Sequence, residues 1–184
     1  MDWQDDPWEE VFDDDYLHFY ADRLSAEPSD RETDQIVALL DRQPGAAVLD
    51  APCGHGRIAN RLAARGLEVV GLDSNSDFLA LARRDAADAG VHVEYVQGDL
   101  RELPWSGRFD AVLNWYTSFG YFDDEGNSRV LSAYRRALKP GGRLLLEQIN
   151  RDSLLLPPHD RRAKRGGKAP RREAHRHPRP RHRR

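Results

Sequence analysis

Cysteine is almost absent from this sequence, since Cys53 is the only one in 184 residues. A single thiol excludes an internal disulfide and a zinc site built from several cysteines, so no metal site is predicted. Long apolar runs are absent too, and no stretch of about 18 apolar residues exists to span a membrane. The N-terminus, MDWQDDPWEE, is acidic where a secretory signal would be basic and then apolar. We therefore expect a cytoplasmic protein.

Positive charge is scarce in most of the chain and concentrated at its end. Residues 151–184 hold 13 Lys and Arg against 3 Asp and Glu, whereas residues 1–150 hold 15 against 28. From about residue 159 the sequence is mostly Arg, His, Pro, Gly and Ala, which cannot bury enough apolar surface to fold. We therefore predict an N-terminal helical segment (1–43), a folded core (44–150) and a basic, disordered tail (151–184).

Within the core, the hydrophobic pattern alternates between the periods of strands and helices. Strands are predicted at 46–50, 68–72, 91–96, 109–115 and 143–149, and helices at 57–65, 76–89 and 124–138. Strands alternating with helices indicate right-handed βαβ units. The sequence therefore predicts an α/β fold, a Rossmann-like three-layer sandwich with a mostly parallel sheet.

Two further helices are predicted ahead of the first strand. One covers about residues 8–23, and the other begins at Ser29, where Glu32 completes a possible capping box. The inner face of this second helix would be Ile36, Leu39 and Leu40.

The loop after the first predicted strand has the features of a ligand-binding loop. Gly54 and Gly56 let the backbone pass close to a ligand, at the edge where parallel sheets bind ligands. Asp50 precedes these glycines, where a carboxylate repels a pyrophosphate and attracts an ammonium. Asp73 ends the second strand, where it can accept hydrogen bonds from ribose hydroxyls, and Asp99 follows the third, near an adenine amino group. The ligand predicted from these carboxylates is an adenosine with a cationic amino-acid end and no phosphate.

A second interpretation of the same loop remains open. Residues 54–59, GHGRIA, also satisfy the relaxed dinucleotide-binding pattern G-x-G-x-x-G/A. An NAD-dependent oxidoreductase is therefore an alternative, although Asp50 stands where it would repel the pyrophosphate.

Five segments, in this order, resemble the motifs of class I S-adenosylmethionine-dependent methyltransferases. They are VLDAPCGHG (48–56), GLD (71–73), QGDL (97–100), FDAV (109–112) and LKPGGRL (138–144). The segment TSFGYFD (117–123) is similar to bacterial small-molecule methyltransferases, including relatives that methylate amino sugars. The resemblance implies S-adenosylmethionine as cofactor, a small-molecule methyl acceptor, and residues 44–150 as the cofactor-binding core. The cofactor-binding residues that it implies are Asp50, Ala51, Gly54, Gly56, Asp73, Phe78, Asp99, Leu100 and Asn114.

The expected reaction is an in-line displacement from a sulfonium to an O, N or C atom. The leaving group needs no protonation, so the enzyme contributes mainly by positioning the reactants and excluding water. No obligatory catalytic residue is therefore predicted. An acceptor that carries a proton needs a base. The candidates are Tyr16, His18, Tyr20, His55 and Tyr116.

Aromatic residues are expected on both sides of this site. Tyr16 and Tyr20 are four apart and share a helix face. The two rings either pack onto the core or cover the cofactor, as such a pair does in the resembled enzymes. Tyr116, Phe119 and Tyr121 follow the fourth strand and would form an aromatic wall against the acceptor.

The resemblance ends near residue 158, where enzymes of this kind continue with two more strands. We therefore expect a sheet without its last two strands, with the apolar residues 144–146 on an edge strand. A frameshifted or truncated product would explain the tail. The alternative is that the tail attracts phosphate through charge, in a nucleic-acid-binding protein or an RNA methyltransferase. The tail lacks aromatic residues for base stacking and the rest of the chain is acidic, so nucleic acid is not the partner that we favour.

Overall fold

The computed structural model describes Phe19 and residues 24–150 of the chain. By its internal contacts the chain divides into two compact units, Met1–Gln148 and Ile149–Arg184, and the fold below is that of the first unit. The predicted helix over 8–23, with Tyr16, His18 and Tyr20, lies outside the described residues, and so does the basic tail.

Helices and strands alternate along the described chain. In order they are α3 (Ala26–Leu40), β1 (Ala47–Asp50), α4 (Arg57–Ala64), β2 (Glu68–Asp73), α5 (Ser76–Asp88), β3 (Val93–Gln97), the 3₁₀ turn η2 (Leu100–Glu102), β4 (Phe109–Asn114), α6 (Asp124–Ala137) and β5 (Leu138–Leu146). The five strands pair in the order β3-β2-β1-β4-β5, and every pair is parallel. This order confirms the predicted Rossmann-like α/β fold. From β1 the chain adds strands first on one side (β2, β3) and then on the other (β4, β5), so the strand order reverses between β1 and β4.

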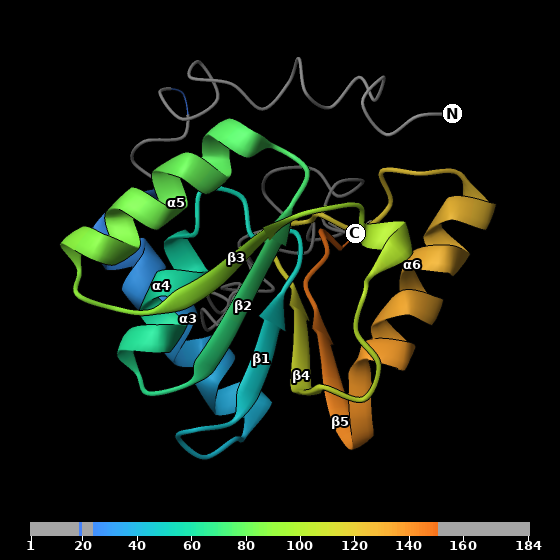
Figure 1. The fold of residues 1–184 in the computed structure, drawn as a ribbon, viewed down its shortest axis with the longest axis horizontal. Coiled ribbons are helices and arrows are strands. Elements are labelled where there is room, and N and C mark those ends of the chain that lie inside the picture. Colours follow the sequence, from blue (N-terminus) through green and yellow to red (C-terminus); the bar gives the residue numbers. More distant parts are fainter. Residues whose placement is uncertain (1–18, 20–23, 151–184) are drawn as a thin grey trace, which may run out of the picture. The chain divides into compact units, whose positions relative to one another are not determined.

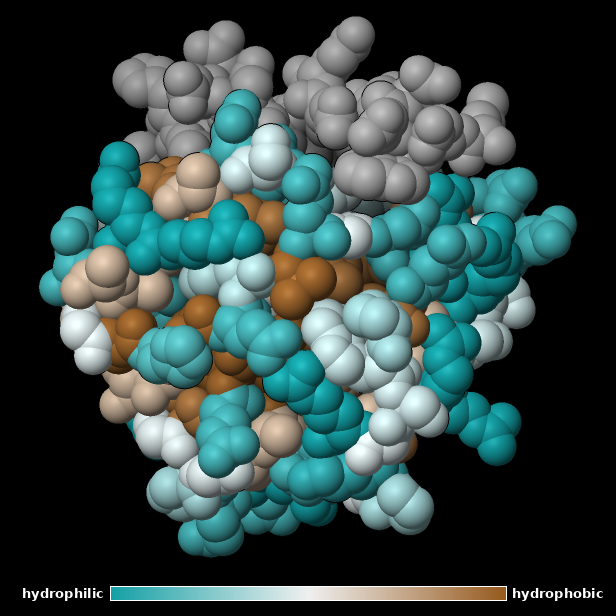
Figure 2. Space-filling model, viewed as in Figure 1, coloured by the Kyte–Doolittle hydropathy of each residue, from teal (hydrophilic) through white to brown (hydrophobic). Residues whose placement is uncertain are grey.

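Helices cover both faces of the sheet, as Figure 1 shows, with α3, α4 and α5 on one side and α6 on the other. On the α6 face, Leu49 of β1, Val112 of β4 and Tyr134 of α6 belong to one buried cluster. On the opposite face, Val48 of β1 packs with Ile36 of α3 and Leu62 of α4 in a second cluster. Strand β1 is covered on both faces because its neighbouring side chains point to opposite sides. On the face in Figure 2, hydrophilic side chains surround the apolar ones, which show in patches near its centre.

Helix α3 differs from its prediction at its start and in its inner face. It begins at Ala26, with Ser25 at the N-cap, and Pro28 lies inside its first turn. Proline is tolerated there because the first-turn N–H groups have no intrahelical acceptor. The buried face includes Ser29, Thr33, Ile36 and Leu40. Leu39 is 57% exposed, so its predicted place on the inner face is wrong.

Strand β5 also begins earlier than predicted. The segment 139–142, predicted to be a turn before the strand, forms an irregularity within it: Phe109 pairs with Leu138, but Ala111 pairs with Arg143. Gly141 takes a positive φ of 76° there. Among the described residues β5 pairs with β4 alone, so it is the edge strand that the sequence predicted, and Leu144 is 39% exposed.

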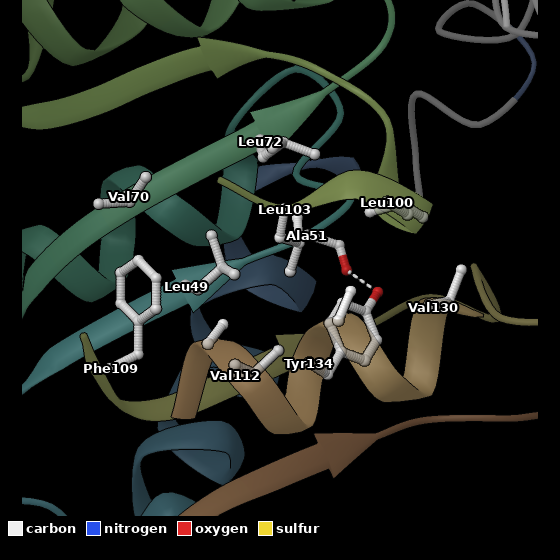
Figure 3. Packing of buried hydrophobic residues seen from close by; sticks show 12 residues of the cluster. Leu49, Ala51, Val70, Leu72, Leu100, Leu103, Phe109, Val112, Val130 and Tyr134 are labelled. Atoms are coloured by element: carbon white, nitrogen blue, oxygen red, sulfur yellow. Dashed lines mark hydrogen bonds between the residues drawn. The ribbon is translucent and has the colours of Figure 1, made fainter. Parts of the chain in front are cut away.

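A buried hydrogen-bond network fixes the end of β1 against α6 and β4. The Tyr134 hydroxyl donates to the Ala51 carbonyl oxygen at 2.7 Å, a bond drawn in Figure 3. Asn114 Nδ2 donates to the Tyr134 hydroxyl at 2.8 Å and to the same carbonyl at 3.2 Å. All three residues are fully buried. The network therefore sets where the chain leaves β1, directly before the glycine loop.

Replacing Tyr134 with Phe tests this network. Tyr134→Phe leaves the packing volume nearly unchanged but removes both bonds of the hydroxyl, so we expect unfolding free energy to fall by about 1–3 kcal/mol. Ser132→Ala is the control, because the exposed Ser132 hydroxyl donates to the Ser128 carbonyl oxygen within α6. A change within about 0.5 kcal/mol is expected. Equal stability of the two variants in urea denaturation would show that the network does not hold β1.

Candidate active site

A cavity opens at the carboxyl ends of β1, β2 and β4, on the line where the strand order reverses. The residues that follow each of these strands line it, together with the start of η2. Ligands bind open parallel sheets at this edge because loops that diverge to opposite faces leave a crevice between them. The predicted residues that line it are Asp50, Gly54, His55, Asp73, Phe78, Asp99, Leu100 and Tyr116.

Asp50 is a buried carboxyl at the end of β1 and is only 2% exposed. No hydrogen bond to its side chain is found among the described residues. Burial raises its pKa to about 8, Arg57 opposes that rise, and the negative charge of Asp73 adds to it. A buried carboxylate without a partner costs free energy, and a cation in the cavity would remove that cost.

Asp73 lies at the end of β2 and is held by backbone donors. Gly54 N donates to Oδ2 at 2.7 Å, and Asn75 N donates to Oδ1 at 3.0 Å. Burial raises the pKa of Asp73, and these backbone bonds oppose the rise. The backbone of Ser74 also bonds to Asp73. Each carboxylate oxygen has two lone pairs, so the group still has the capacity to accept a hydrogen bond from the cavity. The arrangement suits a vicinal diol such as a ribose.

The two predicted glycines have different tasks. Gly54 lines the cavity, has a φ of 54° and leaves open space where a side chain would stand. Gly56 has a φ of 75°, and a methyl group there would collide with the side chains of Tyr95 and Ala82. Gly56 is absent from the cavity lining and serves the packing of α4 against α5 and β3. Its part in holding a cofactor remains a prediction.

Two other predicted cofactor residues, Ala51 and Asn114, also lie outside the cavity lining. The carbonyl of Ala51 and the amide of Asn114 belong to the Tyr134 network below the site. Their part in holding a cofactor remains a prediction, and their position gives them a supporting role beneath the loop.

Apolar and acidic side chains from α5 and η2 line the far end of the cavity. Phe78 and Leu100 are 7% and 8% exposed and offer the apolar faces predicted for an adenine. Asp99, the predicted acceptor for its amino group, is already bound by the Arg101 guanidinium, with Nη2 at 2.6 Å from Oδ2 and Nε at 3.0 Å from Oδ1. Only the remaining lone pairs of Asp99 are therefore available to a ligand.

The two described base candidates both line the cavity. Burial and the positive charge of Arg57 lower the pKa of His55 to about 4, so its imidazole is neutral at pH 7. Tyr116 Oη is buried and has no hydrogen-bond partner in the part of the chain that the structure describes. Of the predicted aromatic wall, Tyr116 and Tyr121 line the cavity, whereas Phe119 packs against the core cluster instead. Trp115 and Phe122, which the prediction did not include, line the cavity beside them.

Arg57 is a buried cation in the cavity wall that the sequence analysis also missed. It is the first residue of α4, and its side chain is 8% exposed. Its Nη1 lies 2.7 Å from Glu32 Oε2 of α3. A cation at the N-terminus of a helix is unfavourable because it opposes the helix dipole. An arginine at the predicted start of this helix could therefore have indicated that Arg57 has an acidic partner elsewhere in the fold.

Comparison with known proteins places this fold and site in a family. Residues 48–142 match the family described as Methyltransferase domain. The chain belongs to this family. The matched segment contains the glycine loop and the three acidic strand ends, and it includes more than half of the chain.

Individual relatives support the same assignment to the methyltransferase-domain family. The Ubiquinone biosynthesis O-methyltransferase of Erwinia tasmaniensis is 33% identical over 112 residues, which are 59% of this chain and 44% of the relative. The PH0226 protein from Pyrococcus horikoshii has a TM-score of 0.65 at 30% identity, covering 78% of this chain and 65% of the other. SAM-bound CalS10 from Micromonospora echinaspora, an amino pentose methyltransferase, has a TM-score of 0.62 at 27% identity, covering 72% and 56%.

This methyltransferase-domain chain spans about half the length of the curated relatives it matches. None of the similarities just given supports the nucleic-acid alternative, which rested on the tail outside the described residues. Within residues 24–150, no helix is long and apolar enough to cross a bilayer. The same residues contain no group of three or more His, Cys, Asp or Glu side chains placed to hold a metal ion.

The buried carboxyl of Asp50 predicts an unusual dependence of stability on pH. Its ordinary pKa of 3.8 applies to the unfolded chain, and the folded value is about 8. Between these values the unfolded state binds fewer protons, so stability falls as pH rises. We expect the unfolding free energy of the wild type to fall relative to that of Asp50→Asn by up to about 1.4 kcal/mol per pH unit. Chemical denaturation of both proteins between about pH 5 and about pH 7 measures this difference in unfolding free energy. Parallel curves for the two proteins would contradict the raised pKa.

Proposed function

We propose that this chain binds S-adenosylmethionine in the cavity and transfers its methyl group to an O, N or C atom of a small molecule. Residues 44–150 would form the cofactor-binding core. The observation that carries the proposal is the pair of buried carboxyl groups, Asp50 and Asp73, at the ends of neighbouring strands. One lacks a hydrogen-bond partner among the described residues, and the other keeps the capacity to accept a hydrogen bond from the cavity.

The cavity fits the three chemical parts of this cofactor. Asp50 would accept the ammonium of the amino-acid end, which supplies the positive charge that a buried carboxylate needs. Asp73 would accept hydrogen bonds from the two ribose hydroxyls while Gly54 N and Asn75 N hold its orientation. Phe78 and Leu100 would pack on the adenine. A pyrophosphate would instead meet Asp50, so the site does not favour a dinucleotide.

The contribution of the chain to methyl transfer would be positioning and exclusion of water. When bound, the cofactor would supply a methyl group activated by its sulfonium, with the neutral thioether as the leaving group. Trp115, Tyr116 and Tyr121 line the side of the cavity that follows β4. Their rings would hold an acceptor against the methyl group and remove water from between the reacting atoms.

A base in the cavity is needed only where the acceptor carries a proton that must be removed. His55 is neutral at pH 7, so it can accept a proton. Its low pKa makes it a weak base, because its protonated form readily gives the proton back. An acceptor that enters unprotonated needs neither His55 nor Tyr116.

The acceptor class is proposed as a small molecule. One reported relative carries a ubiquinone biosynthesis O-methyltransferase name, and one similar structure is an amino pentose methyltransferase. Both descriptions are of small-molecule acceptors, and the aromatic wall beside the cavity suits a compact partly apolar ligand.

Titration of S-adenosylhomocysteine into the full chain by calorimetry tests the proposed cofactor site. We expect saturable binding, and Asp73→Asn should weaken it about 10- to 100-fold because a charged acceptor for two hydroxyls is lost. Asp88→Asn serves as the control, since Asp88 is exposed at the end of α5 and stands outside the cavity lining. That variant should bind like the wild type.

Circular dichroism on the same samples shows whether each protein is folded. A folded wild type that gives no binding heat would rule out the cofactor assignment. Binding that Asp73→Asn leaves unchanged would show that the ligand occupies another site.

A further inference from the structure

Strand β5 lies at one edge of the sheet, because β4 is its only neighbour among the described residues. Glu147, directly after β5, donates its backbone N–H to the Asn114 carbonyl oxygen of β4 at 3.0 Å. Main-chain groups of alternate residues point the same way along a strand, so those of Leu145 also face β4. Leu144 and Leu146 therefore direct their N–H and C=O groups outward, away from the sheet.

The other edge strand, β3, is protected in a way that β5 is not. Gly98 N donates to the Asp73 carbonyl oxygen at 3.0 Å, so by the same alternation the main-chain groups of Tyr95 point outward. Arg83 Nη2 of α5 donates to the Tyr95 carbonyl oxygen at 2.9 Å. A charged side chain over an edge hinders its pairing with another chain. No side chain in the described part of the protein bonds to the outward groups of β5, so β5 is the edge suited to pairing.

The side chains of β5 are complementary to those of a second, antiparallel copy of the same strand. Leu145 is the centre of a run of three leucines, with Arg143 two residues before it and Glu147 two residues after it. In an antiparallel pair centred on Leu145, each Arg143 stands opposite the Glu147 of the other copy. A parallel pair in register would place like charges opposite each other, which is destabilising. Charge therefore favours the antiparallel arrangement.

The main-chain groups of β5 fit the same arrangement. With Leu145 at the centre, Leu144 of one copy stands opposite Leu146 of the other, and these are the residues whose N–H and C=O groups point outward. Each opposed pair would exchange two hydrogen bonds, and the two Leu145 residues would form a non-hydrogen-bonded pair on the twofold axis. A shift by one residue would place outward groups opposite inward ones. Main-chain direction and charge therefore select one register.

The side chains at both ends of this segment retain groups for the contact. The Arg143 side chain is 47% exposed and donates to the end of α3 through Nη1 and Nη2. A guanidinium has five N–H donors, so others remain. Glu147 accepts from Thr117 N through Oε2, and its Oε1 accepts no hydrogen bond among the described residues. Leu144 is 39% exposed, so pairing would also remove apolar surface from water.

We propose that β5 pairs antiparallel with β5 of a second copy of this chain, about a twofold axis at Leu145, and joins two five-stranded sheets into one. The same surface serves both copies, so the assembly closes as a dimer. The two ion pairs between Arg143 and Glu147 would set the register. Because one strand from each copy makes the contact, the dimer would be reversible and would dissociate on dilution. This pairing does not depend on the methyl transfer proposed above.

Sedimentation equilibrium of the full chain between about 1 and about 100 μM measures this association. We expect the mass to rise with concentration from 21.0 kDa toward twice that value. Arg143→Glu and Glu147→Arg should each weaken the dimer about 10-fold, because two pairs of like charges then face each other. The double variant restores opposite charges and should regain most of the association.

Glu94→Arg is the matched control for the charge reversals. It breaks an exposed ion pair with Arg108, with Oε2 and Nη2 2.6 Å apart, at the edge of the sheet opposite β5. We expect it to associate like the wild type. Circular dichroism on the same samples shows that each variant is folded.

A cysteine at the twofold axis tests the register without changing a charge. Two Leu145→Cys residues in a non-hydrogen-bonded pair would have Cα atoms about 4.5 Å apart, within the range of a disulfide. Mild oxidation should therefore link this variant into a covalent dimer on a non-reducing gel. The wild type should stay unlinked, because its Cys53 is 8% exposed. The exposed Gln148→Cys should also stay unlinked, because its two copies would be about 20 Å apart along the strands.

A folded wild type that stays at 21.0 kDa up to about 100 μM would overturn the proposal, and would show that the edge is open or is covered by another segment of the same chain. Association that both charge reversals leave unchanged would assign the contact to another surface. Crosslinking of Gln148→Cys as readily as Leu145→Cys would contradict the register. Each of these results is independent of whether the chain binds S-adenosylhomocysteine.

Discussion

The burial of two carboxyl groups at the ends of β1 and β2 is the constraint on which the rest of the site depends. A carboxylate taken out of water without a partner raises its own pKa, and Asp50 shows this with a value of about 8. The burial of the apolar clusters on both faces of the sheet offsets this unfavourable free energy and holds β1 in place. A cation and hydrogen-bond donors that entered the cavity would relieve this cost. On the proposed function, the same burial that destabilises the site would provide its affinity for the cofactor and its selection against phosphates.

The glycine loop divides its work between ligand and fold. Gly54 faces the cavity and uses its N–H to orient Asp73, so the first loop and the second strand end act together. Gly56 is needed because the side chains of Tyr95 and Ala82 occupy the space of a side chain. The Tyr95 hydroxyl in turn donates to Asn60 Oδ1 at 2.6 Å. One glycine thus serves the site and the other serves the packing that presents it.

Acidic and basic side chains alternate around the cavity, and they come from several separate segments of the sequence. Glu32 from α3 holds Arg57, Arg57 lies close enough to Asp50 to influence its ionisation, and Arg101 holds Asp99 at the other end. Arg57 reduces the cost of burying the Asp50 carboxylate, and Arg101 pairs with the partly buried Asp99. Among the described residues, Arg57 Nη2 has no hydrogen-bond partner and is itself buried.

The sequence by itself determined the fold class, the approximate bounds of most strands and helices, and the carboxylates that meet at one edge of the sheet. These follow from local periodicity and from the rule that parallel strands end on the same side. Only the tertiary structure decided that Leu39 faces outward, that Gly56, Ala51 and Asn114 lie beneath the site, and that Arg57 completes its wall. Each of these depends on which side chains distant segments bring together, as when Glu32 meets Arg57 or Tyr134 meets Ala51. The local hydrophobic pattern of the sequence does not predict such contacts, because they form only when distant helices and strands pack together.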